Sequence, residues 1–131
     1  MIAVDTNILL RYIMQDDPIQ SRRATDFIES FSAADPVFVP LICLTELYWV
    51  LDHTYKLSGS QIRSLLQTVA TSDSLLLEAS TLVGLAIFDY ANGSGDFDDC
   101  LIAQTALASG CDATFTFDKD PAKSGIMRLL E

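Results

Sequence analysis

The chain has 131 residues, half of them hydrophobic, which is enough for one packed domain without disulfide bonds. Its formal net charge of −10 at pH 7, with only eight Lys and Arg residues, argues against a protein that holds nucleic acid through a basic surface. The apolar stretches are too short to span a membrane, and the N-terminus lacks the pattern of a signal peptide. We therefore expect a single cytoplasmic domain over residues 1–131.

Short apolar segments alternate with helical patterns along the chain. Strands are expected at residues 2–4, 37–39, 75–77, 114–117 and 126–130, and helices over residues 6–14, 17–31, 40–55, 58–69, 79–92 and 98–109. Residues 118–121, which end in a proline, would suit a turn. Because strands that alternate with helices usually form a parallel sheet covered on both faces, the pattern predicts an α/β fold.

Three cysteines are present, Cys43, Cys100 and Cys111. They are odd in number, lie in apolar contexts and have no CxxC spacing. We expect all three to be reduced core residues of a cytosolic protein.

Two aspartates come directly after apolar strands. Asp5 follows residues 2–4, and Asp118 follows residues 114–117. Ligands of parallel α/β folds bind beyond the carboxyl ends of the strands, so both carboxylates are expected at the functional edge of the sheet. Each also has a simpler explanation, because Asp5 suits the N-cap of the next helix and Asp118 suits a turn.

Glu46 is the only charged residue between Pro40 and Leu51. Its neighbours three and four positions away on the expected helix are Ile42, Cys43, Trp49 and Val50. This helix is apolar almost all round, so we expect it to be central, with Trp49 in the core. A buried, unpaired carboxylate would cost roughly several kcal/mol, so Glu46 needs either a metal ion or an arginine partner.

Three aspartates surround the start of the helix expected at 98–109, namely Asp96, Asp98 and Asp99. One of them is expected to cap the helix, since acidic residues suit a first turn. Asp98 is expected to be exposed, whereas Asp99 precedes apolar residues at helical spacing and should point toward the core. Asp96 is three positions earlier, and we expect its carboxylate to help orient Asp99 without being a direct ligand itself.

Several carboxylates at one edge of a sheet need compensation by positive charge. Ligands that are all oxygen suit Mg²⁺ or Mn²⁺ better than zinc. The chain has no His/Cys cluster, and its only histidine, His53, is interpreted as an ordinary helix-end residue. The sequence therefore favours metal-assisted chemistry, in which cations activate water and stabilise the leaving oxygen of a phosphodiester.

Four segments in the same order resemble PIN-domain ribonucleases of the VapC toxin type. They read VDTNILLRY at 4–12, LTELYWVL at 44–51, GDFDDCLIA at 95–103 and TFTFD at 114–118. Each motif alone is weak, but four at compatible spacing are fairly specific, and they cover the chain from Ile2 to about Asp118. Cys100 departs mildly from the family pattern, in which a small residue is commoner at that position.

The resemblance implies a site, an activity and a fold. It implies an acidic quartet that holds the metal and carries the catalysis, Asp5, Glu46, Asp99 and Asp118, together with Asp96 as an accessory metal ligand and hydroxyls at Thr6 and Thr116 that orient ligands or water. It implies Mg²⁺- or Mn²⁺-dependent cleavage of RNA. The implied fold is a three-layer α/β/α sandwich with a central, mainly parallel sheet.

The resemblance also implies partners. These are an RNA substrate, a small antitoxin protein encoded beside the toxin, and a second copy in a homodimer, with no membrane involved. Without the four quartet carboxylates the chain would still be acidic, so phosphate affinity should come from the bound metal, helix N-termini and a few basic residues such as Arg11, Lys119 and Lys123.

Two alternatives remain open. A phosphatase with Asp5 as its covalent nucleophile would usually carry a second aspartate two residues later, where this chain has Asn7. A non-catalytic or housekeeping PIN-like protein that binds or processes RNA would not require the intact quartet. An RNA cleavage assay with and without magnesium would separate these alternatives.

Overall fold

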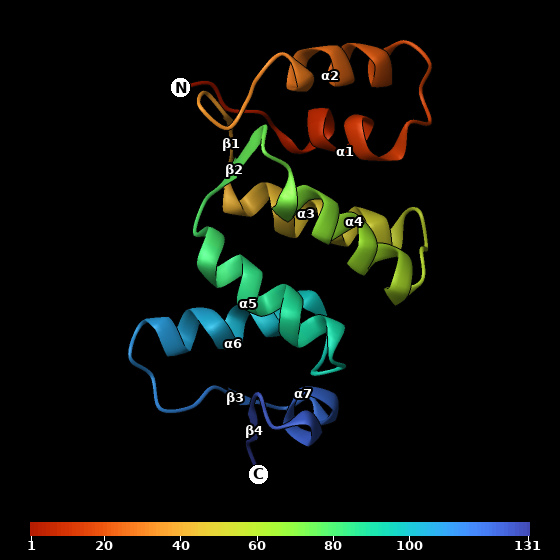
Figure 1. Cartoon of the computed structure of the whole chain (residues 1–131). Coiled ribbons are helices and arrows are strands. Elements are labelled where there is room, and N and C mark those ends of the chain that lie inside the picture. Colours follow the sequence, from red (N-terminus) through yellow and green to blue (C-terminus); the bar gives the residue numbers. More distant parts are fainter. The chain divides into compact units, whose positions relative to one another are not determined.

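The computed structural model describes all residues from 1 to 131. They divide into two units, Met1–Ser80 and Thr81–Glu131, which we describe separately (Figure 1). Each unit combines helices with parallel strands, which confirms the predicted α/β class. None of the helices has both the length and the hydrophobicity needed to cross a lipid bilayer.

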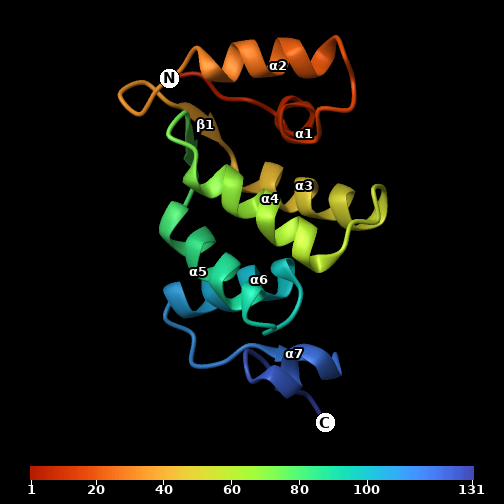
Figure 2. The same cartoon turned by 45° about the vertical axis from the view of Figure 1, so that its right-hand side comes forward.

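The first unit contains four helices and two strands. In chain order they are α1 (Thr6–Met14), α2 (Gln20–Glu29), β1 (Val37–Val39), α3 (Leu41–His53), α4 (Gly59–Thr71) and β2 (Leu75–Leu77). Helix α1 packs against α2 and α3, and α3 packs against α4. The pairs α1–α2 and α3–α4 lie side by side in both orientations (Figures 1 and 2). All six elements were predicted: α1, β1 and β2 have the predicted ends, and the ends of α2, α3 and α4 differ by a few residues.

Strands β1 and β2 of this unit pair in parallel, with Val37 opposite Leu75. Ala3 adds a parallel bridge to Phe38, so the predicted first strand is reduced to a single bridge residue. The core combines strand residues with one face of each helix. Its fully buried side chains include Leu9, Ile28, Val37, Val39, Leu44, Leu47, Leu51, Ile62, Leu66 and Val69.

Helix starts in the first unit follow local capping rules, with one exception. Ser58 forms a capping box with Gln61 at the start of α4. Asp17 accepts hydrogen bonds from the amides of Ile19 and Gln20 just before α2. Helix α3 follows Pro40, which has no side-chain oxygen, and there the carboxylate of Glu78 accepts a 2.8 Å hydrogen bond from the Leu41 amide. Because Glu78 lies 37 residues away in the sequence, local pattern did not predict this cap.

The second unit contains three helices and two short strands. They are α5 (Ser80–Ala91, which starts at the last residue of the first unit), α6 (Phe97–Ala108), β3 (Phe115–Thr116), α7 (Lys119–Ser124) and β4 (Arg128–Leu129). Strands β3 and β4 pair in parallel, and α7 packs against both of them. The sequence pattern did not predict α7, and the chain forms this helix where residues 118–121 also suited a turn. This helix ends at Gly125, whose φ of 89° suits a glycine C-terminal cap.

Two of the three cysteines are buried, as predicted. Cys43 and Cys100 lie in the core, and all three cysteines are free. The prediction was wrong for Cys111, which is exposed. Cys111 follows Gly110 in the loop after α6, where no strand or helix packs its side chain into the core.

Candidate functional site

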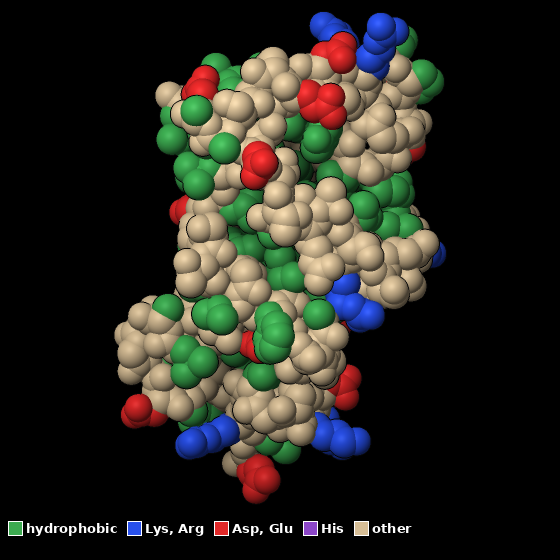
Figure 3. Space-filling model, in the orientation of Figure 1, with side chains coloured by type: hydrophobic (Ala, Val, Ile, Leu, Met, Phe, Trp, Pro, Cys, Tyr) green, Lys and Arg blue, Asp and Glu red, His purple; other side chains and the backbone are tan.

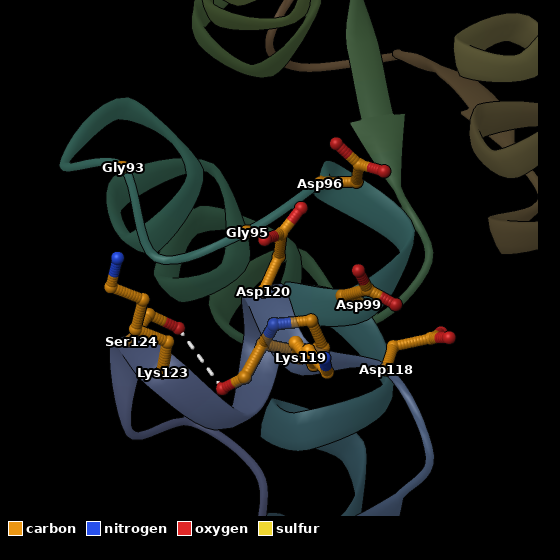
Figure 4. A pocket seen from close by; sticks show the side chains of 10 residues that line it. Gly93, Gly95, Asp96, Asp99, Asp118, Lys119, Asp120, Lys123 and Ser124 are labelled. Carbon is orange, nitrogen blue, oxygen red and sulfur yellow. Dashed lines mark hydrogen bonds between the residues drawn. The ribbon is translucent and has the colours of Figure 1, made fainter.

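A pocket of about 760 Å³ lies in the second unit (Figure 4). It is formed by the loop before α6, the first turn of α6, Asp118 between β3 and α7, and α7 itself. Its lining residues are Gly93, Gly95, Asp96, Asp99, Asp118, Lys119, Asp120, Pro121, Lys123 and Ser124. Three of the predicted metal ligands, Asp96, Asp99 and Asp118, therefore face the same space.

Three aspartates at the start of α6 lie close together but do not all face the pocket. One carboxylate oxygen each from Asp96, Asp98 and Asp99 lies within 4.8 Å of the other two. Asp96 occupies the N-cap position, but its side chain does not form the capping hydrogen bond that we expected from one of the three. Instead the exposed Asp98 accepts a 3.1 Å hydrogen bond from the Asp99 amide. Asp96 and Asp99 line the pocket, and Asp98 does not.

The pKa of Asp99 is clearly raised by its surroundings. Burial raises its pKa above the ordinary aspartate value, and the negative charges of Asp98, Asp96 and Asp118 raise it further. A hydrogen bond from the Asp96 backbone opposes these effects only in part. Ionised Asp99 is thus held in an unfavourable environment, which a bound cation would relieve.

The raised pKa of Asp99 predicts that Asp99→Asn stabilises the metal-free protein at pH 7. A carboxyl whose pKa is higher in the folded than in the unfolded chain destabilises the fold once it ionises, and this penalty disappears below the ordinary pKa of 3.8. We expect the melting temperature to rise by about 2–4 °C at pH 7, with no gain near pH 3. Thermal unfolding in EDTA at both pH values measures the difference.

The control for this experiment is Asp112→Asn. Asp112 is an exposed carboxylate of the same unit that does not line the pocket, so its replacement changes the net charge equally. An equal gain in this variant would attribute the effect to total charge. A gain by Asp99→Asn that persists at pH 3 would contradict the proposed electrostatic cause.

Gly95 and Cys100 lie next to Asp99 at the start of α6. Gly95 has a φ of 136°, which side-chain-bearing residues rarely adopt, and a Cβ there would lie 3.8 Å from Asp99 Oδ2. Cys100 is fully buried, and its thiol donates to the Gly95 carbonyl oxygen at 3.8 Å. Burial and neighbouring carboxylates raise the pKa of Cys100 to about 12, so it remains a neutral thiol. The departure from the family pattern at this position therefore adds no reactive group.

Asp118 lies at the junction of β3 and α7. It is the N-cap residue of α7, although its side chain forms no capping hydrogen bond. The Thr116 hydroxyl accepts a 3.0 Å hydrogen bond from the Asp118 amide. Thr116 therefore holds the backbone that carries Asp118, and the Asp118 carboxylate lines the pocket.

The remaining predicted site residues belong to the first unit. Asp5 is the N-cap of α1 and accepts a 3.2 Å hydrogen bond from the Ile8 amide through Oδ1, as its simpler explanation predicted. That bond leaves its other carboxylate oxygen for a further contact. Thr6 is the first residue of α1 and is partly exposed.

The prediction that Glu46 is buried was wrong. Helix α3 buries the face formed by Cys43, Leu44, Leu47, Tyr48 and Leu51. Glu46 lies on the opposite, exposed face together with Ile42 and Trp49, which are 65% and 55% exposed. The expectation of a core position for Trp49 was therefore also wrong, because only one face of this nearly all-apolar helix is covered. The Trp49 ring stacks on His53 with centroids 4.5 Å apart.

Sequence reasoning missed Asp120 and Ser124, which line the pocket from α7. The local signal for this helix was present in the sequence. Asp118 is a suitable N-cap, Pro121 is compatible with a first turn, and Gly125 is a suitable C-terminal cap. A six-residue helix is too short to show hydrophobic periodicity, which explains why the pattern was interpreted as a turn.

Comparison with known proteins places these residues in a family. The model of the PIN domain family matches residues 2–125. The chain belongs to the PIN domain family. The match spans residues from both units and confirms the predicted PIN-like α/β fold.

One curated relative is the VapC ribonuclease of Aquifex aeolicus (strain VF5). It is 26% identical to the chain over 125 residues, which cover 95% of this chain and 93% of the relative. The similarity thus extends over almost the full length of both proteins.

Proposed function

We propose that this PIN domain is a metal-dependent endoribonuclease and the toxin of a VapBC-type toxin–antitoxin pair. The observation that carries the proposal is the meeting of Asp96, Asp99 and Asp118 in one pocket. Two segments about 20 residues apart in the sequence supply them, and both segments belong to the pattern that resembles VapC nucleases. The name of the relative, a VapC ribonuclease, supports the same activity.

The metal in this proposal is Mg²⁺ or Mn²⁺. We assign Asp5, Glu46, Asp99 and Asp118 as its ligands, with Asp96 as an accessory ligand. The donor chemistry fits, because all five side chains are carboxylates and the pocket contains no histidine or cysteine. The unfavourable environment of ionised Asp99 also fits a site that holds positive charge.

The chain's own groups would act by position and charge. Asp99 and Asp118 would hold the cation from α6 and from the end of β3, and Thr116 would keep Asp118 in place through its backbone amide. Thr6 would orient a ligand or water beside Asp5. A cation bound there supplies an activated water and stabilises the charge that develops on the phosphodiester. Because no histidine lines the pocket, proton transfer would fall to the carboxylates and to solvent.

Further features of the proposal concern partners and organisation. The substrate is RNA, and the cognate partner is an antitoxin protein that keeps the acidic site idle. We also propose that both units act as one PIN domain in a cytoplasmic homodimer. The family match across residues 2–125 supports treating the two units together.

The test of this proposal is a cleavage assay on a fluorogenic RNA with purified full-length protein. We expect cleavage with Mg²⁺ or Mn²⁺ and none in EDTA, because the carboxylates alone cannot stabilise the leaving oxygen. Ca²⁺ should support little cleavage, since its looser coordination positions water less strictly. Cleavage that is unaffected by EDTA, or hydrolysis of a phosphate monoester in place of RNA, would contradict the proposal.

A further inference from the structure

Two lysines face the carboxylates across the same pocket. Lys119 and Lys123 both line it, and they lie four residues apart on α7, so they share one face of that helix. Figure 4 shows Asp96, Asp99 and Asp118 on one side of the pocket and the Lys123 side chain on the other. Helix α7 also contributes Asp120 to the lining, so the two lysines lie in one pocket with four carboxylates.

Neither lysine forms an ion pair with the carboxylates around it. No ion pair within 4.0 Å joins the ammonium group of Lys119 or Lys123 to a carboxylate, although four carboxylates line the same pocket. Arg11, the third basic residue expected to contact phosphate, differs from the two lysines because it forms an ion pair. Its guanidinium pairs with Asp16 at 3.2 Å and donates to Gln20 at 2.9 Å, so this cation is already paired with a carboxylate.

Basic side chains are otherwise scattered over the molecule. On the face drawn in Figure 3, Lys and Arg form small separate groups and no continuous basic surface. The chain has only eight such residues, and two of them line this single pocket. A strongly acidic chain that must bind a polyanion needs its few cations next to the reacting group, and α7 supplies them there.

We propose that Lys119 and Lys123 form a phosphate-binding edge that holds the RNA backbone next to the metal-binding carboxylates. This inference rests on the proposed nuclease function and assigns the residues that position its substrate. The four carboxylates and two ammonium groups of the lining carry a net charge of minus two, and a bound divalent cation would reduce the repulsion that phosphate meets there. With metal bound, the two ammonium groups attract phosphate against a smaller opposing charge. RNA binding therefore requires the metal and the lysines together.

Phosphate contacts carry no base information, so the edge binds RNA backbones of any sequence. It fixes the position of the strand along the pocket, and other contacts must choose the target. Substrate binding thus depends on salt through these lysines, because each phosphate contact releases a counterion.

The experiment measures equilibrium binding of fluorescein-labelled oligouridylate and oligoadenylate by anisotropy over a range of KCl concentrations. Ca²⁺ replaces Mg²⁺ to limit cleavage. The variants are Lys119→Met, Lys123→Met, the double variant and Lys123→Arg. Both lysines are exposed, so these replacements should leave the melting temperature unchanged. Lys56→Met is the matched control, because it removes the same charge from an exposed lysine that does not line the pocket.

We expect each pocket lysine to account for about 0.7 of the slope of log affinity against log salt, the value for one phosphate contact on a single strand. The double variant should lose about twice that amount, equally for both RNAs, while Lys123→Arg and Lys56→Met keep the wild-type slope. In cleavage assays with Mg²⁺, Lys123→Met should raise KM several-fold with little change in kcat.

Two outcomes would overturn the inference, and only the second would also overturn the proposed nuclease function. If the wild type binds and cleaves RNA but the double variant keeps the wild-type salt slope, the phosphate edge is wrong and the nuclease proposal stands. If the wild type neither binds RNA with metal present nor cleaves it, both proposals fail.

Discussion

Replacing Asp99 with asparagine is expected to lower metal-dependent RNA cleavage by about 10²–10³-fold, the size of effect of removing one group that stabilises transition-state charge. The side chain keeps its shape but loses the charge that holds the cation. Asp99 lies deeper than its acidic neighbours and is surrounded by three of them, so a cation bound in the pocket would gain most from its charge. Initial cleavage rates at saturating Mn²⁺, measured together with thermal unfolding, give the result.

Asp98→Asn is the matched control for this variant. Asp98 is the adjacent residue of the same helix turn, is exposed and does not line the pocket. We expect it to retain cleavage within a few-fold of the wild type. Equal losses in both variants would indicate a general electrostatic effect of α6, and wild-type cleavage by Asp99→Asn would remove Asp99 from the metal site.

The same assay tests whether the acids of the first unit belong to this site. Asp5→Asn should lower cleavage by a similar factor if Asp5 and Asp99 hold the same metal. Groups that act together give strongly non-additive effects, so the Asp5→Asn/Asp99→Asn double variant should be no slower than either single variant. Multiplied losses would instead indicate that the two carboxylates act independently.

Truncating Phe97 to alanine is expected to destabilise the protein by about 3–5 kcal/mol and to lower its melting temperature by about 10–20 °C. Phe97 is the first residue of α6, is fully buried, and has its ring centroid 6.2 Å from that of Tyr90. Its ring anchors the turn that carries Asp96 and Asp99, and alanine would leave a cavity there. Thermal unfolding of the metal-free protein measures the loss.

Phe117→Ala is the control for Phe97→Ala, because it removes the same ring from a side chain that is 78% exposed. We expect its stability to lie within about 0.5 kcal/mol of the wild type. A similar loss in both variants would contradict the view that Phe97 acts through core packing. Phe97→Leu, which fills most of the volume, should recover much of the stability.

Local pattern was sufficient for most elements of this fold. The helix at Thr6–Met14 and the strands at Val37–Val39 and Leu75–Leu77 lie where the sequence predicted them. Each is decided by hydrophobic spacing and by neighbouring residues such as the Ser58 cap, which act within one or two turns. Helix α7 and the Glu78 cap were missed, because the first is too short for periodicity and the second joins distant residues.

The acidic cluster shows the same division between sequence and structure. The positions of Asp96 and Asp99 before a helix, and of Asp118 after a strand, were sufficient to select them from 18 acidic residues. The environment of Glu46 was not predictable in the same way. Apolar neighbours on a helix show that some face is buried, but which face is covered depends on what packs against α3.

By itself, the sequence determined the alternation of helices and strands, the caps and the acidic motifs, because these depend on residues close together in the chain. Only the tertiary structure decided that Asp96, Asp99 and Asp118 share a pocket with two unpaired lysines, and that Asp98 does not line it. The physical reason is that a side chain's direction and its charged neighbours follow from packing between elements. In this chain, the packing of α7 against β3 and β4 decides where the lysines lie.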